Sequence, residues 1–332
     1  MTTLLKAQYD SRGPVPQDVI RAVPFEAPVL AQGEALVAVL AAPINPSDVL
    51  TLTGQYGILP PLPAIGGSEG VGRVVALGPD TAGPAVGQTV LLPPGLGTWA
   101  SHVVAPAARL LPLPGEADPA QLSMLTVNPP TASLLLSDFA ELQPGDWVIQ
   151  NSANSGVGGY LVQLARLRGL RTVNIVRRES AVEGVRALGG DVVLVDGEHL
   201  AERVKDATQG APIKLGIDAV AGAATRRLAA CLAEGATLVN YGALSGEPCA
   251  VSTRELVFRD ITLKGFWLAR WFRQAPLGQQ LTLLTELAGQ IAAGHLHAPI
   301  QATYDVSRIQ EAVAAAAAGE RQGKILIVPT HG

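Results

Sequence analysis

Short apolar runs separated by glycines and prolines make up the first 120 residues of the chain. Turn residues that recur roughly every ten positions are typical of the strands of a small barrel or sandwich. Strands are predicted at residues 3–8, 35–40, 71–77, 89–92 and 102–104. The segment 44–70 is too long and too rich in turn residues for a plain connection, and such loops often carry functional groups. It contains Asn45, Asp48, Tyr56, Ser68 and Glu69.

The pattern changes at Trp147, after which strand-like and helix-like segments alternate. Alternation of this kind predicts a parallel sheet with helices on both faces, as in doubly wound nucleotide-binding domains. Helices fit between the strands, for example over residues 223–232. The six predicted strands are 147–150, 172–176, 192–195, 215–220, 237–241 and 262–268.

Two further segments connect these parts. Residues 121–139 are apolar and predict the crossing between domains, with a helix from Thr131 and two prolines near its first turn. After residue 272, apolar residues at helical spacing predict a helix over 281–291, which is followed by a helix at 307–318 and a strand at 324–328. We expect this tail to return to the first domain.

The predicted fold class is therefore α/β, with two domains, for which 332 residues suffice. The β-rich domain comprises residues 1–120 and 272–332, and the doubly wound cofactor domain comprises residues 121–271.

A small-residue loop follows the first strand of the doubly wound domain. It reads Ala153-x-x-Gly156-x-x-Gly159, and a helix and then a second strand follow it. A helix start presents unpaired N–H groups and the positive end of the helix dipole, and small residues let a pyrophosphate approach closely. A glycine-rich turn without a ligand is the alternative. The strand before the loop and the helix and strand after it favour dinucleotide binding.

The end of the second strand distinguishes between the two nicotinamide dinucleotides. NAD is usually held there by an acidic residue that binds the ribose 2′-hydroxyl. This chain has Arg177 and Arg178 instead, with Glu179 only afterwards. Guanidinium groups suit a 2′-phosphate, so the sequence favours NADPH over NADH. Two solvated surface arginines are the alternative.

Composition limits the classes of partner. Charged residues make up 16% of the chain, the net charge is −4, and no basic run exceeds two residues. Nucleic acids and anionic membranes are therefore not expected partners. Two cysteines exclude a disulfide framework and favour a reducing compartment. The segment MTTLLKAQYDSRGP has neither a signal-peptide core nor an arginine-rich transit helix, so we expect a cytoplasmic protein.

Several stretches together resemble the medium-chain dehydrogenase/reductase superfamily, and within it the 2-enoyl thioester reductases (trans-2-enoyl-CoA/ACP reductases). The resemblance covers nearly the whole chain and implies a GroES-like catalytic domain beside a Rossmann-type cofactor domain. The stretches are INPSD (44–48), GQYGILPPLPAIGGSEG (54–70), VNPPTA (127–132), LQPGDWVIQNSANSGVG (142–158), TVNIVRR (172–178), YGALS (241–245) and GFWLARW (265–271).

The resemblance also implies roles for individual residues. Tyr56 would be the catalytic proton donor, and Arg177 and Arg178 would hold the 2′-phosphate. The chain departs from some members of the family at Glu179, where they have a basic residue, and at Ser68, where asparagine can occur. The implied cofactor-binding residues are Asn45, Asn128, Asn154, Ser155, Gly156, Val157, Gly158, Arg177, Arg178, Tyr241, Gly242, Ala243, Leu244, Phe266, Trp267, Leu268 and Lys324.

For three residues an alternative role stays open. Trp267 fits a core or dimer-interface position as well as a place against the cofactor or acyl pocket. Lys324 fits a solvated surface lysine as well as a phosphate contact. Asp218, near the end of the fourth strand, is more easily a structural residue or a carboxylate at the cofactor cleft than a base.

Metal-free chemistry is expected. The zinc alcohol dehydrogenases of the superfamily need convergent Cys, His or Glu ligands. Here the corresponding segment is Asn45-Pro46-Ser47-Asp48, Ser68 precedes Glu69, and no four-cysteine cluster is present. Hydride addition to a C=C bond conjugated to a carbonyl needs no metal. It needs donors for the enolate oxygen and a proton at the α-carbon, which the phenol of Tyr56 can supply.

The function that we predict is NADPH-dependent reduction of trans-2-enoyl thioesters, with CoA and acyl-carrier-protein substrates both open. A quinone or enone reductase with the same hydride geometry is the first alternative. A non-catalytic NADPH-binding protein is the second, because a fold does not fix a function. A homodimer is expected by analogy, since members of the superfamily commonly pair through the last strand of the nucleotide domain.

Overall fold

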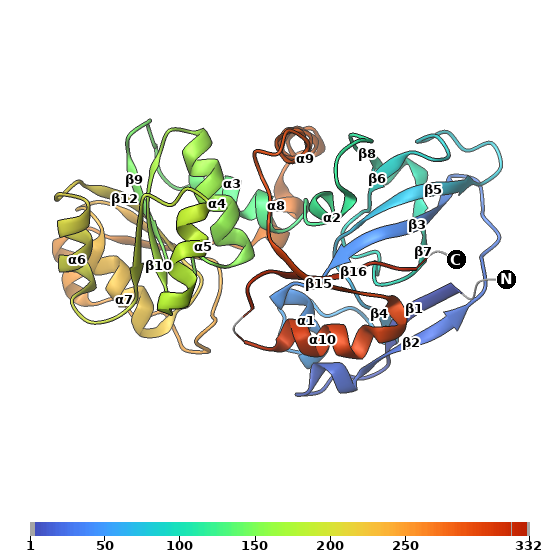
Figure 1. Ribbon diagram of the computed structural model, residues 1–332, viewed down its shortest axis with the longest axis horizontal. Coiled ribbons are helices and arrows are strands. Elements are labelled where there is room, and N and C mark those ends of the chain that lie inside the picture. The colour runs from blue at the N-terminus through green and yellow to red at the C-terminus, as the bar shows by residue number, and fades with distance from the viewer. Residues whose placement is uncertain (1–3, 320, 331–332) are drawn as a thin grey trace. The chain divides into compact units, whose positions relative to one another are not determined.

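The computed structural model describes residues 4–319 and 321–330, which form two compact units. Unit 1 contains the described residues as far as Val127 and those from Leu281 onward, and unit 2 is Asn128–Gln280. Figure 1 shows that unit 1 is built from both ends of the chain, coloured blue and red. The domain limits inferred from the sequence stay a prediction.

Unit 1 contains two sheets. In the smaller sheet, β1 (Leu4–Tyr9) lies between β2 (Ile20–Phe25) and β4 (Ala64–Ile65), antiparallel to both. The larger sheet has the order β15-β16-β3-β5-β6-β8, with β7 also paired with β3. Its strands are β3 (Glu34–Pro43), β5 (Val71–Leu77), β6 (Thr89–Leu91), β7 (His102–Pro106), β8 (Leu111–Pro112), β15 (Ile300–Tyr304) and β16 (Lys324–Ile327).

The C-terminal strand completes the larger sheet of unit 1. Strand β16 is parallel to β15 and antiparallel to β3, with Leu326 opposite Pro43 and Ile327 opposite Ala42. The tail of the chain therefore returns to the β-rich unit. The short α-helices of this unit are α1 (Pro46–Thr53), α2 (Pro119–Leu122) and α10 (Ile309–Ala317). A longer helix, α9 (Leu277–Ala292), starts at the end of unit 2 and has most of its residues in unit 1.

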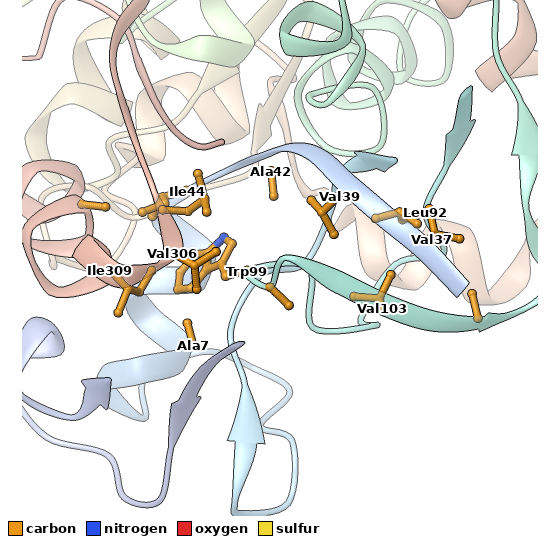
Figure 2. Packing of buried hydrophobic residues seen from close by; sticks show 14 of the residues in the cluster. Ala7, Val37, Val39, Ala42, Ile44, Leu92, Trp99, Val103, Val306 and Ile309 are labelled. Atoms are coloured by element: carbon orange, nitrogen blue, oxygen red, sulfur yellow. The ribbon is translucent and has the colours of Figure 1, made fainter. Parts of the chain in front are cut away.

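The core of unit 1 lies between its sheets and α10. Alternate residues of β3, among them Val37 and Val39, are fully buried, as expected of a strand with a face in the core. Figure 2 shows Trp99 close to Ile44 and Val306. The indole Nε1 of Trp99 donates a hydrogen bond of 3.1 Å to the carbonyl of Pro43, so its polar atom is satisfied inside the core.

Unit 2 contains a parallel six-stranded sheet with the order β11-β10-β9-β12-β13-β14. The first strand in the sequence is thus central, and the strand order reverses between β9 and β12, as in the doubly wound fold that the sequence predicts. The strands are β9 (Trp147–Gln150), β10 (Arg171–Val176), β11 (Val192–Val195), β12 (Ile213–Asp218), β13 (Thr237–Asn240) and β14 (Thr262–Gly265).

Six α-helices accompany the sheet in the described part of unit 2. Within this unit α3 lies beside α4, and α6 lies beside α7 (Figure 1). The helices are α3 (Asn128–Ser137), α4 (Gly156–Leu167), α5 (Val182–Ala187), α6 (Leu200–Ala207), α7 (Gly222–Cys231) and α8 (Leu268–Gln274). The apolar strands β9 and β10 are buried almost throughout, since helices cover both faces of a parallel sheet.

The predicted elements differ from the observed ones in a few places. The strand predicted at 262–268 ends at Gly265, and Leu268 already begins α8. Strands β2, β4, β8 and β15 were not among the predicted strands. Thr3, where the first strand was predicted to begin, lies outside the described residues. Among the described residues, no helix is both long and apolar enough to cross a membrane.

Candidate functional site

The glycine loop of unit 2 forms the start of α4. Ser155 is the N-cap of this helix, and its hydroxyl oxygen accepts a hydrogen bond of 3.1 Å from the N–H of Gly158. A Cβ atom at Gly158 would lie 2.5 Å from the carbonyl oxygen of Ala153, which is closer than real Cβ contacts. The loop therefore requires glycine for its own tight turn. It leaves the N–H groups of a 12-residue helix directed at the end of β9, which is the cradle that a pyrophosphate needs.

Two other predicted cofactor residues lie next to this loop. A Cβ at Gly156 would lie 3.2 Å from the side-chain carboxamide of Asn128, so Asn128 at the start of α3 reaches the start of α4. Burial raises the pKa of Tyr241, and the nearby Ser155 side chain opposes that rise. The structure thus brings Asn128, Ser155, Gly156 and Tyr241 together. Asn154 and Val157 flank Ser155 and Gly156 in the same loop.

A buried network of polar side chains holds the loops at the carboxyl ends of β9 and β12. Asp218 is fully buried, and its Oδ1 accepts hydrogen bonds from Asn151 Nδ2 at 2.6 Å and from the N–H of Val220 at 2.9 Å. Its Oδ2 accepts from Thr225 Oγ1 at 2.6 Å and from Asn240 Nδ2 at 3.1 Å. Asp218 therefore fixes backbone and is structural. The network spans the point where the strand order reverses, which is where doubly wound sheets bind ligands.

The segment after β13 is held by the same edge of the sheet. The N–H of Tyr241 donates to the carbonyl of Asp218 at 2.9 Å, and the N–H of Leu244 donates to that of Ala219 at 3.1 Å. A Cβ at Gly242 would lie 2.9 Å from the Ala219 carbonyl oxygen, so this position favours glycine. Ala243 and Leu244 are exposed. They are available to a ligand bound at this edge.

Arg177 and Arg178 directly follow β10, the neighbour of β9 in the sheet. Arg177 is exposed, Arg178 is half-buried, and Glu179 begins a turn of 3₁₀-helix after them. A guanidinium at the carboxyl end of this strand is placed where doubly wound domains accommodate the 2′-phosphate of NADP. The residues present therefore fit NADPH at both its pyrophosphate and its 2′-phosphate.

Phe266, Trp267 and Leu268 connect β14 to α8. The N–H of Phe266 donates to the carbonyl of Asn240 at 2.9 Å, and its ring packs edge to face on Phe139 with centroids 5.7 Å apart. Trp267 is half-buried, and the guanidinium carbon of Arg273 lies 5.0 Å from the centroid of its ring. Trp267 is therefore not a core residue of unit 2, and a surface role, at a ligand or at another chain, remains for it.

In unit 1, a buried polar cluster surrounds Glu69. The carboxylate of Glu69 is 0% exposed. Its Oε1 accepts from Asn45 Nδ2 at 2.7 Å, and its Oε2 accepts from the N–H and the hydroxyl of Thr126 at 3.0 and 2.9 Å. The Nζ of Lys324 donates to Asn45 Oδ1, and the N–H of Asn45 donates to Asp48 Oδ2 at 2.8 Å. Asn45 and Lys324, 279 positions apart in the sequence, thus meet in this cluster.

Burial shifts the ionisation of all three charged groups of this cluster. It raises the pKa of Glu69 to about 7, although the Lys324 ammonium and the hydrogen bonds from Asn45 and Thr126 oppose that shift. It likewise raises the pKa of Asp48 to about 6. It lowers the pKa of Lys324 to about 8, against the attraction of Glu69. Lys324 is therefore a buried lysine that donates to Asn45, and not a solvated surface residue.

The donors of this cluster do not fit a zinc ion. A tetrahedral zinc site needs three or four convergent Cys, His or carboxylate ligands. Within residues 4–319 and 321–330, no three His, Cys, Asp or Glu side chains gather in such a group. Beside Glu69 the structure has the carboxamide of Asn45 and the ammonium of Lys324, and a positively charged partner is unfavourable to a bound cation.

Tyr56 lies three residues after the end of α1, in the loop that connects α1 to β4. Gly54 caps α1 in the left-handed conformation, with φ of 78°, and the N–H groups of Gln55 and Tyr56 donate to the carbonyl of Leu50 at 2.8 and 3.2 Å. These bonds fix the backbone of Tyr56 at the end of the helix. Its side chain is half-buried.

The predicted site residues thus divide between the units. Tyr56, Asn45 and Lys324 belong to unit 1, and the others belong to unit 2. The sequence drew attention to Glu69 and Asp48 but assigned neither a role. A glutamate between glycines in an apolar segment was the available signal for the buried cluster. Arg12, which donates a hydrogen bond to the carbonyl of Pro60 in the loop of Tyr56, had no such signal.

Comparisons with known proteins agree with this architecture. Residues 31–115 match the family model of the alcohol dehydrogenase GroES-like domain, and residues 156–284 match that of the zinc-binding dehydrogenases. The chain is 37% identical over 306 residues to the mitochondrial enoyl-[acyl-carrier-protein] reductase of Rattus norvegicus, covering 90% of this chain and 82% of the rat protein.

Solved structures show the same similarity. The mitochondrial 2-enoyl thioester reductase Etr1p/Etr2p heterodimer from Candida tropicalis is 25% identical, with a TM-score of 0.88 over 99% of this chain and 100% of that one. Etr1p in complex with NADP and crotonyl-CoA gives the same values. A mycobacterial quinone oxidoreductase is also 25% identical, with a TM-score of 0.84 over 98% of this chain and 100% of that one.

One expectation is wrong in the light of these relatives. The sequence led us to expect a cytoplasmic protein, but the rat relative and the Arabidopsis thaliana relative, which is also 37% identical, are mitochondrial enzymes. The residue types could not reveal this, because a low cysteine count indicates a reducing environment and does not distinguish one reducing compartment from another.

Proposed function

This chain belongs to the enoyl-[acyl-carrier-protein] reductase family, and we propose that it reduces trans-2-enoyl thioesters with NADPH by means of Tyr56 as the proton donor. The identity of 37% over nine-tenths of the chain is the observation that carries the reaction. The helix-start cradle at Ser155 supports the use of NADPH. The cluster around Glu69 supports hydride addition to an activated double bond, because its carboxamide and ammonium groups do not suit a zinc ion.

The residues of the chain divide the work as follows. Bound NADPH supplies the hydride that adds to the β-carbon of the substrate. Ser155 and the N–H groups at the start of α4 bind the pyrophosphate, and Arg177 and Arg178 bind the 2′-phosphate. Addition of hydride moves negative charge to the thioester oxygen, where donors must stabilise it. The phenol of Tyr56 then donates its proton to the α-carbon.

A comparison of acceptors tests the reaction. We expect a higher kcat/KM for a short trans-2-enoyl-CoA than for 1,4-benzoquinone or a simple enone. One NADPH should be consumed for each enoyl-CoA that is reduced. A preference for the quinone would support the second candidate, which the likeness to the mycobacterial quinone oxidoreductase favours. NADPH binding without consumption on any acceptor would contradict both.

Replacement of the phenol tests Tyr56. Tyr56→Phe removes the proton and little else, so we expect kcat to fall by about 10²-fold or more while the Kd for NADPH stays within about twofold. Tyr304→Phe is a matched control, since Tyr304 is also half-buried in unit 1 and lies on β15. An unchanged kcat in Tyr56→Phe would remove this residue from the mechanism.

We also propose that two copies of the chain pair through β14. This strand is the edge of the six-stranded sheet, and all four of its residues are exposed. Beside it in the sequence, Val257 and Phe258 are 65% and 76% exposed, which is unusual for large apolar side chains unless another surface covers them. Light scattering should give a dimer mass, and Leu263→Pro should give a monomer. A monomeric unaltered chain would contradict the pairing.

A further inference from the structure

The loop that carries Tyr56 has little packing of its own. It runs from Gly54 to Pro63 between α1 and β4. Three of its apolar side chains, Ile58, Leu59 and Leu62, are 44%, 40% and 38% exposed. Because these side chains leave 38–44% of their surface in water, burial holds this loop less firmly than it holds the fully buried core.

One hydrogen bond ties the second half of the loop to the rest of unit 1. The Nη2 of Arg12 donates to the carbonyl oxygen of Pro60. In the described structure, residues 57–63 make no backbone-to-backbone hydrogen bond outside regular elements, so the Arg12 bond is their polar attachment. The first half of the loop is held separately, through the N–H groups of Gln55 and Tyr56.

Arg12 is itself fixed by buried structure. It follows β1, whose last residue, Tyr9, is 1% exposed and sits in the core of the unit. The Arg12 guanidinium lies beside the phenol of Tyr9 and opposes the rise in its pKa that burial causes. The backbone beside it is also anchored, since the N–H of Gly13 donates to the carbonyl of Leu52 in α1 at 3.2 Å. One guanidinium thus connects a core tyrosine with the tip of an otherwise exposed loop.

The loop also approaches Arg12 at its beginning. A Cβ at Gly54 would lie 3.4 Å from Cδ of Arg12, so the aliphatic part of the arginine passes over the C-terminal cap of α1. Arginine suits this position better than lysine, because its planar guanidinium donates in two directions at once. Arg12 therefore contacts the loop on both sides of Tyr56, at Gly54 and at Pro60.

We propose that Arg12 is a positioning residue that holds the loop of residues 54–63 and thereby sets the place of the Tyr56 phenol. The inference rests on the proposed role of Tyr56 in proton donation. Arg12 touches neither substrate nor cofactor in this account. It acts through the backbone of the loop, and a displacement of a reacting group by about 1 Å is enough to lower a rate by up to roughly 10²-fold.

The test is a short series of variants in the full-length protein. Arg12→Met keeps the length of the side chain and removes every donor, and Arg12→Lys keeps one donor. With trans-2-enoyl-CoA we expect kcat to fall at least about tenfold in the methionine variant and less in the lysine variant, with the Kd for NADPH within about twofold. Arg21→Met is the matched control, because Arg21 is an exposed arginine of the same unit whose partner is Asp10; its kcat should not change.

Two further measurements separate positioning from general stability. If Arg12 acts through Tyr56, the double variant Arg12→Met/Tyr56→Phe should be no slower than Tyr56→Phe alone; multiplied losses would overturn the inference. Hydrogen exchange should become faster in Arg12→Met at the amides of Gln55 and Tyr56, which donate to the carbonyl of Leu50, while those of β1 stay protected.

The outcomes are distinguishable from a failure of the proposed function. If the unaltered protein does not reduce enoyl-CoA, the proposed function is refuted before any variant is made, and the exchange rates alone decide whether Arg12 holds the loop. If Arg12→Met does not fold, kcat and the hydrogen exchange of the loop are compared with those of the unaltered protein in Arg12→Lys and Tyr9→Phe instead. A native kcat and native loop exchange in the folded variants would overturn the inference.

Discussion

Glu69 holds together the buried cluster of unit 1, so Glu69→Gln is the most direct perturbation of it. The substitution keeps the shape of the side chain and replaces one acceptor oxygen by an NH₂ group. The carboxylate of Glu69 faces donors on both sides, Asn45 Nδ2 at 2.7 Å and Thr126 at 2.9 and 3.0 Å. Whichever way the new amide turns, its NH₂ group therefore meets a donor.

The magnitude follows from burial. With 0% exposure at this position, water cannot relieve the opposed donors, which costs about 1–3 kcal/mol. The Lys324 ammonium also loses the attraction of the Glu69 carboxylate, although it keeps that of Asp48, so this loss stays below the roughly 3–5 kcal/mol of a broken buried ion pair. Against this, a neutral amide is less costly to bury than a carboxylate. We expect a net loss of about 3 kcal/mol in the free energy of unfolding of unit 1.

Urea unfolding can measure this loss in unit 1 alone. Trp99 is buried in the core of unit 1, whereas Trp147, Trp267 and Trp271 belong to unit 2 and can be replaced by phenylalanine. The midpoint should fall while the slope with denaturant stays the same, because the folded surface is unchanged. The control is Glu116→Gln at an exposed position, which should stay within about 0.5 kcal/mol of the parent.

Two results would refute this reasoning. A loss below about 1 kcal/mol would mean that the three hydrogen bonds of Glu69 contribute little beyond their desolvation. Full additivity with Lys324→Met would mean that the two residues do not interact through Asn45, since coupled residues give non-additive changes. We expect instead that the double variant loses less stability than the sum of the single variants.

Three other predictions concern pH, the cofactor loop and the cofactor phosphate. Because the pKa of Glu69 is raised from 4.5 to about 7, the folded chain holds more protons than the unfolded chain across that window. The free energy of unfolding should therefore fall as the pH rises from 4.5 to about 7, and it should change less with pH in Glu69→Gln. Urea unfolding at several pH values measures both proteins, and an equal dependence on pH would argue against the shifted pKa. Gly158→Ala places Cβ 2.5 Å from the Ala153 carbonyl and should cost about 1–3 kcal/mol and weaken NADPH binding, whereas Gly289→Ala, with open space around it in a helix, should raise Tm. Arg177→Ala should raise the Kd for NADPH about tenfold or more and leave that for NADH nearly unchanged; equal losses in a fluorescence titration would contradict the 2′-phosphate assignment.

Much of unit 2 could be predicted from the sequence because buried parallel strands are continuous apolar runs. Strands β9 and β11 have the predicted limits, and β10 begins one residue earlier. The error at α8 has a physical cause, since the run FWLARWF is apolar at both strand and helix spacing. In unit 1, β2 was missed because Arg21 and Pro24 interrupt its apolar pattern.

The sites were predictable to different degrees for a similar reason. The glycine loop and Arg177 belong to a local sequence pattern, so their place at the ends of β9 and β10 follows from the strand–loop–helix–strand order. The cluster around Glu69 depends on β16 pairing with β3, a contact between distant segments that periodicity does not encode. Arg12 is a single polar residue outside any motif, so its contact with Pro60 became visible only in three dimensions.

The pairing of β16 with β3 also determines when unit 1 can be completed. Unit 2 is one contiguous stretch of chain, so a ribosome delivers all of it before the last strand of unit 1 is made. Until then the end of β3 at Ala42 and Pro43 lacks its partner, and the carboxylate of Glu69 lacks the ammonium of Lys324. Unit 1 therefore matures last, and a chain cut short before residue 324 would expose a sheet edge suited to aggregation.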